Sequence, residues 1–256
     1  MEFETVIYHK KDQVAVITLN RPSVLNAMNK QLWLDLRNAL HEAAMDDDVR
    51  AVVLTGQGRA FSTGADLKDS RDRTIHQYRD YLNHLQETSR LIIRFEKPTI
   101  AAVNGYALGS GYELALACDL RIAGEGTRFG SPEAKVSSSV TGGALRLLPL
   151  LVGPGKAKEL FFTSGMIDGR EALRIGLVNQ VVADDCLMEA AMDMARKIVP
   201  NSAFSIRLIK KGIDMAPEVS LDALMNYEIE ACLATVSSPE RQKALEDFQT
   251  RKVKTE

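Results

Sequence analysis

Two carboxylates of this sequence, Glu113 and Glu133, stand next to segments that could support acid–base chemistry. The stretch Asn104–Asp119, NGYALGSGYELALACD, places three glycines after an apolar run, and good helix formers follow around Glu113. This order predicts a strand, a glycine turn and a helix. Such a turn directs backbone N–H groups and the positive end of the helix dipole toward the space before the helix. The stretch therefore predicts a place where negative charge is stabilised beside a carboxylate.

Three interpretations fit this glycine cluster. The first is a tight strand-to-helix connection in which glycine only allows close packing. The second is a dinucleotide-binding turn, which requires an acidic residue about 20 residues later. Glu125 lies near that distance but within a Gly-Glu-Gly turn, and the chain has no Tyr-x-x-x-Lys pair, which disfavours a short-chain dehydrogenase. The third is an oxyanion hole, in which N–H groups meet a carbonyl oxygen as it becomes anionic.

A second glycine turn, Ser62–Asp66, resembles the first in its position between a strand and a predicted helix. Two N–H donors from separate turns are what an enolate oxygen requires, and removing one such donor typically costs about 3 kcal/mol of transition-state stabilisation. Glu113 and Glu133 would add general acid–base groups. From the residues alone, simpler roles stay open: Glu113 could complement the helix N-terminus, and Glu133 could be an acidic residue of a capping turn.

Four blocks together resemble the crotonase family, also called the enoyl-CoA hydratase/isomerase family. They are residues 18–27 (TLNRPSVLNA), 59–68 (RAFSTGADLK), 98–119 and 129–133 (FGSPE), and they occur in the family's order and spacing. The likeness extends from about residue 3 to residue 182. It implies an α/β crotonase fold: a spiral of ββα units followed by a C-terminal helical region that assembles a homotrimer or a dimer of trimers.

The resemblance also implies roles for individual residues, closest to those of an enoyl-CoA hydratase. The backbone N–H groups of Ala65 and Ser110 would form the oxyanion hole; Ser110 replaces the family's usual glycine, which is tolerable because only its N–H would be used. Glu113 would hold and deprotonate a water, and Glu133 would give a proton to Cα of a trans-2-enoyl thioester. No metal or redox cofactor is implied, since coenzyme A is part of the substrate.

Binding of that acyl-CoA thioester is implied for a further set of residues. They lie in the loop after Asn-Arg-Pro, in and after the Ser62–Asp66 turn, before Ser110 and near the chain end: Val24, Leu25, Ala65, Asp66, Leu67, Lys68, Gly109, Phe248 and Arg251. Phe248 would act from a neighbouring subunit, and Arg251 stands where the family has lysine. Taken alone, Lys68 is equally well a solvated surface lysine.

The sequence departs from the family pattern after Glu133. The usual Pro-Gly-x-Gly-Gly is replaced by a segment containing three serines, at 137–139, and Thr141, and Tyr112 stands where many members have cysteine. These residues suggest a polar acyl group or, equally, a solvated turn. Two glutamates favour hydration over double-bond isomerisation, because isomerases often use one acid. Thioester hydrolysis and a non-catalytic role in binding RNA or a partner remain as alternatives.

Alternating strands and helices are expected to position these groups. Two β-branched stretches, Phe3–His9 and Val14–Leu19, predict a β-hairpin, and Asn29 predicts the cap of a helix that ends near Met45. Ser131 and Pro132 are typical of a helix start. The remaining pattern predicts strands at Ala51–Thr55, Thr99–Val103 and Val178–Val182, a helix over Tyr81–Phe95 and a charged, mobile connection over Asp69–Tyr78.

From Asp184 onward the pattern is helical only. Strands that alternate with helices indicate an α/β domain. We therefore expect an α/β core with the acyl-CoA site over residues 1–200 and a helical region over residues 201–256.

Composition narrows the function classes. The 256 residues carry a formal net charge of −2 and are 45% hydrophobic, which gives no electrostatic case for nucleic acid or an anionic membrane. No apolar stretch approaches the roughly 18 residues of a membrane span, and no basic-then-apolar leader is visible. Three dispersed cysteines and four histidines lack metal-ligand spacing. We expect a cytoplasmic protein without a metal site.

Overall fold

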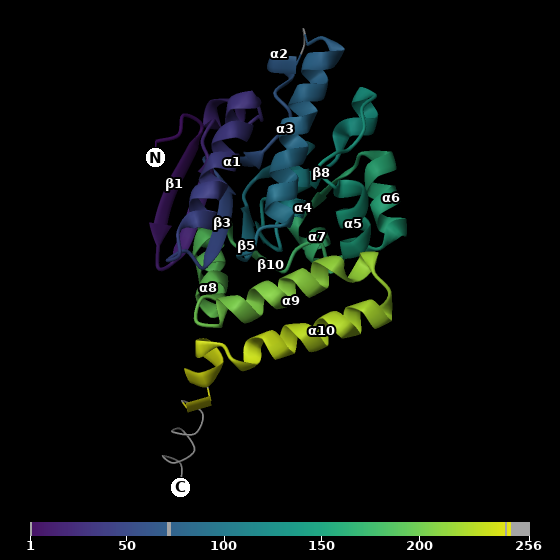
Figure 1. Cartoon of the computed structure of the whole chain (residues 1–256). Helices are drawn as coiled ribbons and strands as arrows, with labels where there is room; N and C mark the ends of the chain where they lie inside the picture. The colour runs from purple at the N-terminus through teal and green to yellow at the C-terminus, as the bar shows by residue number, and fades with distance from the viewer. Residues whose placement is uncertain (1, 71–72, 244, 247–256) are drawn as a thin grey trace. The chain divides into compact units, whose positions relative to one another are not determined.

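The computed structural model describes residues 2–70, 73–243, 245 and 246 (Figure 1). The chain divides into two compact units, Met1–Ile198 and Val199–Glu256.

The first unit is built on a six-stranded sheet with the order β1-β2-β3-β5-β7-β10. β1 and β2 form the predicted antiparallel hairpin, and the remaining pairs are parallel. Every residue of β2 and β5 is buried, as expected for central strands covered on both faces. The bounds are β1 Val6–Lys11, β2 Val14–Leu19, β3 Ala51–Gly56, β5 Thr99–Val103, β7 Leu120–Gly124 and β10 Gln180–Val182.

A second, four-stranded sheet positions the candidate site. Its order is β4-β6-β8-β9, with bounds Ala60–Ser62, Tyr106–Leu108, Arg128–Gly130 and Met166–Asp168. Each of the first three strands follows a strand of the large sheet and precedes helical structure, which gives repeated ββα units. Because β4, β6 and β8 are parallel, their carboxyl ends lie at one edge. The segments after these strands contain Ala65, Ser110 and Glu133.

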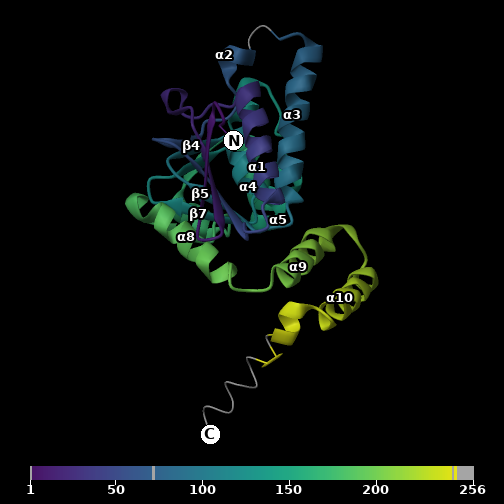
Figure 2. The same ribbon diagram turned by 60° about the vertical axis from the view of Figure 1, so that its left-hand side comes forward.

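Helices cover both faces of the large sheet. α1 (Lys30–Met45) and α3 (Ile75–Ile93) lie side by side on one face, and α8 (Leu187–Ile198) lies on the other (Figure 2). All eight residues of α4 (Ser110–Ala117) are buried. The other helices of this unit are η1 (Pro22–Val24), α2 (Leu67–Ser70), η2 (Pro132–Val136), α5 (Ala144–Val152), α6 (Pro154–Thr163), α7 (Gly169–Arg174) and η3 (Asp184–Cys186).

The second unit contains α9 (Ala203–Met215), η4 (Ala216–Glu218) and α10 (Leu221–Val236). The Tyr227 hydroxyl of α10 donates a hydrogen bond of 2.8 Å to the Leu208 carbonyl of α9 and so joins the two helices. α10 also carries exposed apolar side chains at every fourth position, Leu221, Met225, Ile229 and Leu233. We call these four residues the α10 stripe.

Several local predictions need correction. The mobile connection predicted over Asp69–Tyr78 is wrong in its second half, because α3 begins at Ile75. A capping box starts this helix: Thr74 Oγ1 accepts from the Gln77 N–H while the Gln77 side chain accepts from the Thr74 N–H. The short strands β6 and β9 were not predicted, and Pro132–Val136 is a 3-10 helix without a side-chain cap from Ser131.

Candidate functional site

The two glycine turns pack backbone against backbone. Gly64 adopts φ +89°, and a Cβ added there would lie 2.7 Å from the Leu108 carbonyl oxygen and 3.2 Å from the Ser110 nitrogen. A Cβ added at Gly111 would lie 2.3 Å from the Ser62 carbonyl oxygen. Real side chains do not fit at such distances, so glycine at both positions lets the turns approach each other. The structure therefore brings the segments of Ala65 and Ser110 together.

Backbone pairing directs the Ala65 N–H. Met28 bridges this turn: its N–H donates to the Gly64 carbonyl (2.8 Å), and its carbonyl accepts from the Asp66 N–H (3.2 Å). Successive peptide groups of an extended segment point in opposite directions, so the N–H of Ala65 points away from Met28. Ser110 is the first residue of α4, where N–H groups have no partner within the helix. Both N–H groups are thus left available by their own secondary structure.

Glu113 is buried in the first turn of α4, with 3% of its surface exposed. One residue holds both of its carboxylate oxygens: the Thr141 N–H donates to Oε1 (2.5 Å) and the Thr141 hydroxyl donates to Oε2 (2.7 Å). Burial raises the pKa of Glu113 to about 7, the Thr141 hydrogen bonds oppose that rise, and the negative charge of Glu133 adds to it. A carboxylate with a pKa near neutral is suited to general base catalysis.

Glu133 lies on η2, across the second glycine turn. Its Oε2 accepts a hydrogen bond of 2.5 Å from the Ser131 hydroxyl. A Cβ added at Gly109 would lie 3.0 Å from Glu133 Oε1 and 3.8 Å from Gly64 Cα, so this carboxylate faces the point where the two turns meet. The structure thus gathers both glutamates around the turns that carry Ala65 and Ser110.

Asn26 supports this arrangement and was not singled out from the sequence. It is fully buried with φ +55°, its side-chain NH2 donates to Ala60 O (2.7 Å) and Gln57 O (3.0 Å), and its Oδ1 accepts from the Arg21 N–H (2.8 Å). The Ser62 hydroxyl donates in turn to the Asn26 carbonyl (2.8 Å). A buried amide with these partners fixes the loop against β4. Its only signal in the sequence was its place in the first family block.

The residues predicted to bind coenzyme A are spread more widely. Leu25 lies beside the site, because its carbonyl accepts from the Thr63 N–H (3.1 Å), and it follows Val24 at the end of η1. Asp66 pairs with Arg21 at 2.9 Å, whereas Leu67 is exposed. Phe248 and Arg251 lie outside the described residues.

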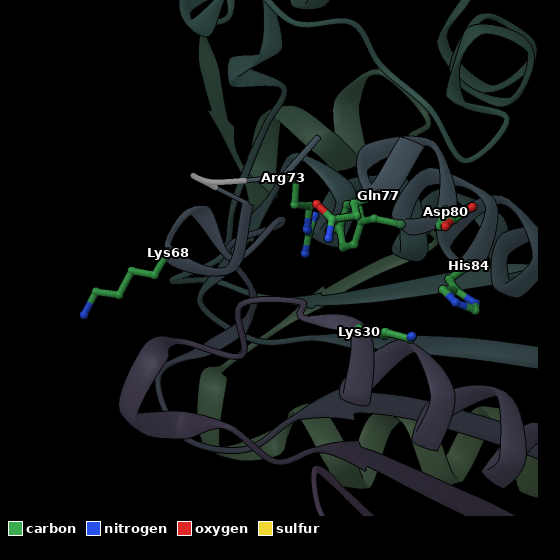
Figure 3. Close-up of a pocket in the computed structure, with 7 residues that line it drawn as sticks. Lys30, Lys68, Arg73, Gln77, Asp80 and His84 are labelled. Carbon is green, nitrogen blue, oxygen red and sulfur yellow. The ribbon is translucent and has the colours of Figure 1, made fainter. Parts of the chain in front are cut away.

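Lys68 lines a charged cavity of about 480 Å³ beside the site. The other lining residues are Lys30, Arg73, Gln77, Asp80, Tyr81 and His84, most of them from α3 (Figure 3). Lys68 extends away from the rest of the group in Figure 3. The lining is polar and carries three cationic side chains, Lys30, Lys68 and Arg73, against one anionic side chain, Asp80, which suits an anionic group better than an apolar one.

Other chemical groups receive less support from the described part of the chain. Within it, no cluster of three or more histidine, cysteine, aspartate or glutamate side chains could hold a metal ion, and no helix is long and apolar enough to cross a membrane. Tyr112 is buried against Phe129, with the ring centroids 5.8 Å apart. Burial raises the pKa of its phenol, so Tyr112 stays neutral.

Comparison with known proteins identifies the family of the chain. The sequence pattern described as "Enoyl-CoA hydratase/isomerase" matches residues 9–255, beyond the limit of about 182 inferred from the blocks. The short-chain-enoyl-CoA hydratase of Clostridium acetobutylicum is 39% identical over 97% of this chain and 95% of its own. The crotonyl-CoA hydratase of Syntrophomonas wolfei is 37% identical over 94% of each chain.

A solved structure shows the same fold. The crystal structure of an enoyl-CoA hydratase from Bacillus anthracis superposes with a TM-score of 0.94 at 34% identity, and 97% of each chain is covered. The predicted α/β crotonase fold is confirmed. The two mixed sheets, the glycine turns and the match over nearly all of the sequence lead to one conclusion: the chain belongs to the enoyl-CoA hydratase/isomerase, or crotonase, family.

Proposed function

We propose that this protein hydrates a trans-2-enoyl-CoA to a 3-hydroxyacyl-CoA. The observation that carries the proposal is Glu113, a buried carboxylate with a pKa of about 7 in the helical turn that begins at Ser110. The negative charge of Glu133 contributes to this raised pKa. One carboxylate near its titration point beside another is a typical arrangement for paired acid and base roles.

In the proposed reaction, the N–H groups of Ala65 and Ser110 bind the thioester oxygen and withdraw electron density from Cβ. Glu113 takes a proton from water as the oxygen of that water adds to Cβ. The enolate charge rests in the oxyanion hole until Glu133, which enters this step in its protonated form, gives a proton to Cα. Return of the proton from Glu113 to Glu133, directly or through water, then restores both groups. The net change adds one water across the double bond, and coenzyme A holds the acyl group in place.

The relatives and the acyl segment suggest which substrate to test first. Two relatives are named for short-chain and crotonyl thioesters, which makes crotonyl-CoA the first choice here. The three serines at 137–139 are exposed, which favours the solvated-turn interpretation over a polar acyl pocket. Thr141 already uses its N–H and its hydroxyl to hold Glu113.

The test follows the absorbance of the enoyl thioester on mixing with crotonyl-CoA. We expect wild-type protein to remove this absorbance, and Glu113→Gln and Glu133→Gln each to slow the reaction by at least about 100-fold, the usual scale for a lost general acid or base. Glu189→Gln, an exposed glutamate on α8, is the matched control. Full activity in both site variants would refute the assigned roles, and turnover of a 3-enoyl-CoA without hydration would point to an isomerase.

We also propose that the C-terminal unit assembles the chain into a trimer or a dimer of trimers. The exposed α10 stripe supports this, since apolar side chains in a row usually meet a partner.

A further inference from the structure

Tyr81 lies behind the proposed oxyanion hole, on α3. Its ring is 5% exposed, and its hydroxyl donates a hydrogen bond of 3.1 Å to the Met28 carbonyl. That carbonyl also accepts from the Asp66 N–H, and the Met28 N–H donates to Gly64. Met28 is therefore the residue that fixes the direction of the Ala65 peptide, and the phenol of Tyr81 fixes Met28.

Two buried donors approach the same phenol from other elements. They are the Ser110 hydroxyl of α4 and the Trp33 Nε1–H of α1. Neither forms a full hydrogen bond with any residue in the described ranges. α3, which carries Tyr81, packs against both α1 and α4. Burial raises the pKa of the Tyr81 phenol, and the side chains of Trp33 and Ser110 oppose this rise. Buried donors without partners are costly, so a pair of them around one oxygen requires an explanation.

The hydrogen-bonding capacities match. A phenol donates one hydrogen bond and accepts up to two. Tyr81 donates to Met28, which leaves its oxygen free to accept from both Ser110 and Trp33. Hydrogen bonds of enzyme sites are often long before substrate binds and shorten in the complex. The Arg73 guanidinium, 4.0 Å from the centroid of the Tyr81 ring, keeps the ring in place.

We propose that Tyr81 is a positioning residue that holds the two N–H donors of the oxyanion hole at a fixed separation. Its phenol connects the Ala65 turn, through Met28, to the side chain of Ser110. The serine that replaces the family's usual glycine thus supplies the second end of this connection, because glycine has no hydroxyl to donate. This inference rests on the proposed hydratase function.

The experiment compares Tyr81→Phe, Ser110→Ala and the double variant with wild type. Tyr78→Phe is the control, because Tyr78 lies one turn earlier on α3, is exposed and stacks on Tyr81 with a centroid distance of 6.4 Å. Two quantities are measured: kcat and KM with crotonyl-CoA, and the absorbance shift of bound 4-(dimethylamino)cinnamoyl-CoA. The shift reports polarisation of the thioester carbonyl without turnover, so a merely structural role would not change it in folded protein.

We expect Tyr81→Phe and Ser110→Ala each to lower kcat by about three- to tenfold, the scale of one net hydrogen bond, with little change in KM. Both should reduce the red shift. The double variant should be no slower than the slower single variant, because each change breaks the same connection. Tyr78→Phe should match wild type.

Wild-type kcat and red shift in Tyr81→Phe would overturn the inference while hydration stands, and so would losses that multiply in the double variant. If Tyr81→Phe does not fold, Ser110→Ala is the deciding variant, because it leaves the buried side chain of Tyr81 intact. An unchanged red shift in Ser110→Ala would contradict the proposed connection. A wild-type protein that neither hydrates crotonyl-CoA nor shifts the probe would instead overturn the proposed function, and the inference with it.

Discussion

The buried environment of Glu113 disfavours the ionised form of its carboxyl group. Its pKa of about 7, above its ordinary value of 4.5, means that the folded protein binds a proton more tightly than the unfolded chain. The stability that this proton contributes is complete below pH 4.5 and is lost as the pH rises through about 7. Burial thus makes the group chemically useful and destabilises the ionised protein.

Glu113→Gln should therefore stabilise the protein while it removes activity. Glutamine is neutral at every pH, so we expect the free energy of unfolding at about pH 8.5 to exceed that of wild type by up to about 3 kcal/mol. Near pH 4.5 the two proteins should be equally stable. Urea denaturation at both pH values measures this. Equal stability at the higher pH would show that the ionised carboxylate is not under strain.

Thr141 sets the pH at which Glu113 becomes a base. The Thr141 hydroxyl stabilises the ionised carboxylate through its hydrogen bond of 2.7 Å to Glu113 Oε2. Thr141→Val should therefore raise the pKa of Glu113 and move the acid limb of the pH profile of kcat/KM up by about one pH unit. Thr141→Ser keeps the hydroxyl and should leave the limb near pH 7. If the acid limb does not move in Thr141→Val, the limb reports the titration of a group other than Glu113.

At this scale the sequence predicted residue types but not their surroundings. Glu113 and Glu133 could be named because their spacing from glycine turns is visible in the chain. Thr141 and Asn26 could not be assigned their contacts, because their partners lie 28 and 34 positions away in the sequence. The burial that raises the pKa of Glu113 depends on such contacts.

The packing of α4 on β4 decides whether the two turns meet. A Cβ at Gly111 would lie 2.3 Å from the Ser62 carbonyl oxygen, so Gly111→Ala must push the helix away from the Ala65 turn. We expect overpacking to lower the free energy of unfolding by about 1–3 kcal/mol. We also expect kcat to fall by more than the accompanying decrease in the fraction of folded protein can explain. Gly155→Ala is the matched control, because it lies on α6 with nothing within 4 Å of the added Cβ. Similar behaviour of the two variants would contradict the proposed packing.

The elements of the large sheet were predictable, and those of the small sheet mostly were not. β2, β3 and β5 are buried apolar runs, a pattern that is visible locally. β6 and β9 have three residues each, too few for an alternating pattern, and they exist because they pair with neighbours. The start of α3 was missed because its first turn is exposed and follows a charged stretch of sequence, although its Thr-x-x-Gln capping box is present in the sequence.

For the whole molecule, the α10 stripe predicts association between copies of the chain. Met225→Lys together with Ile229→Lys should shift the protein to monomers in analytical ultracentrifugation, because it places two charges in an apolar contact. Asn226→Lys, exposed on the same helix outside the stripe, is the control. An unchanged sedimentation coefficient in the double variant would exclude α10 from the interface.

The oxyanion hole of the proposed site consists of peptide groups, which every residue type except proline possesses. Alanine scanning would therefore pass over positions 65 and 110 without removing either donor, and only an amide-to-ester replacement in the main chain could delete one. The same fact means that a change of side chain at those positions keeps both donors, so chemistry of this kind can persist in homologues that share little more than a third of their residues.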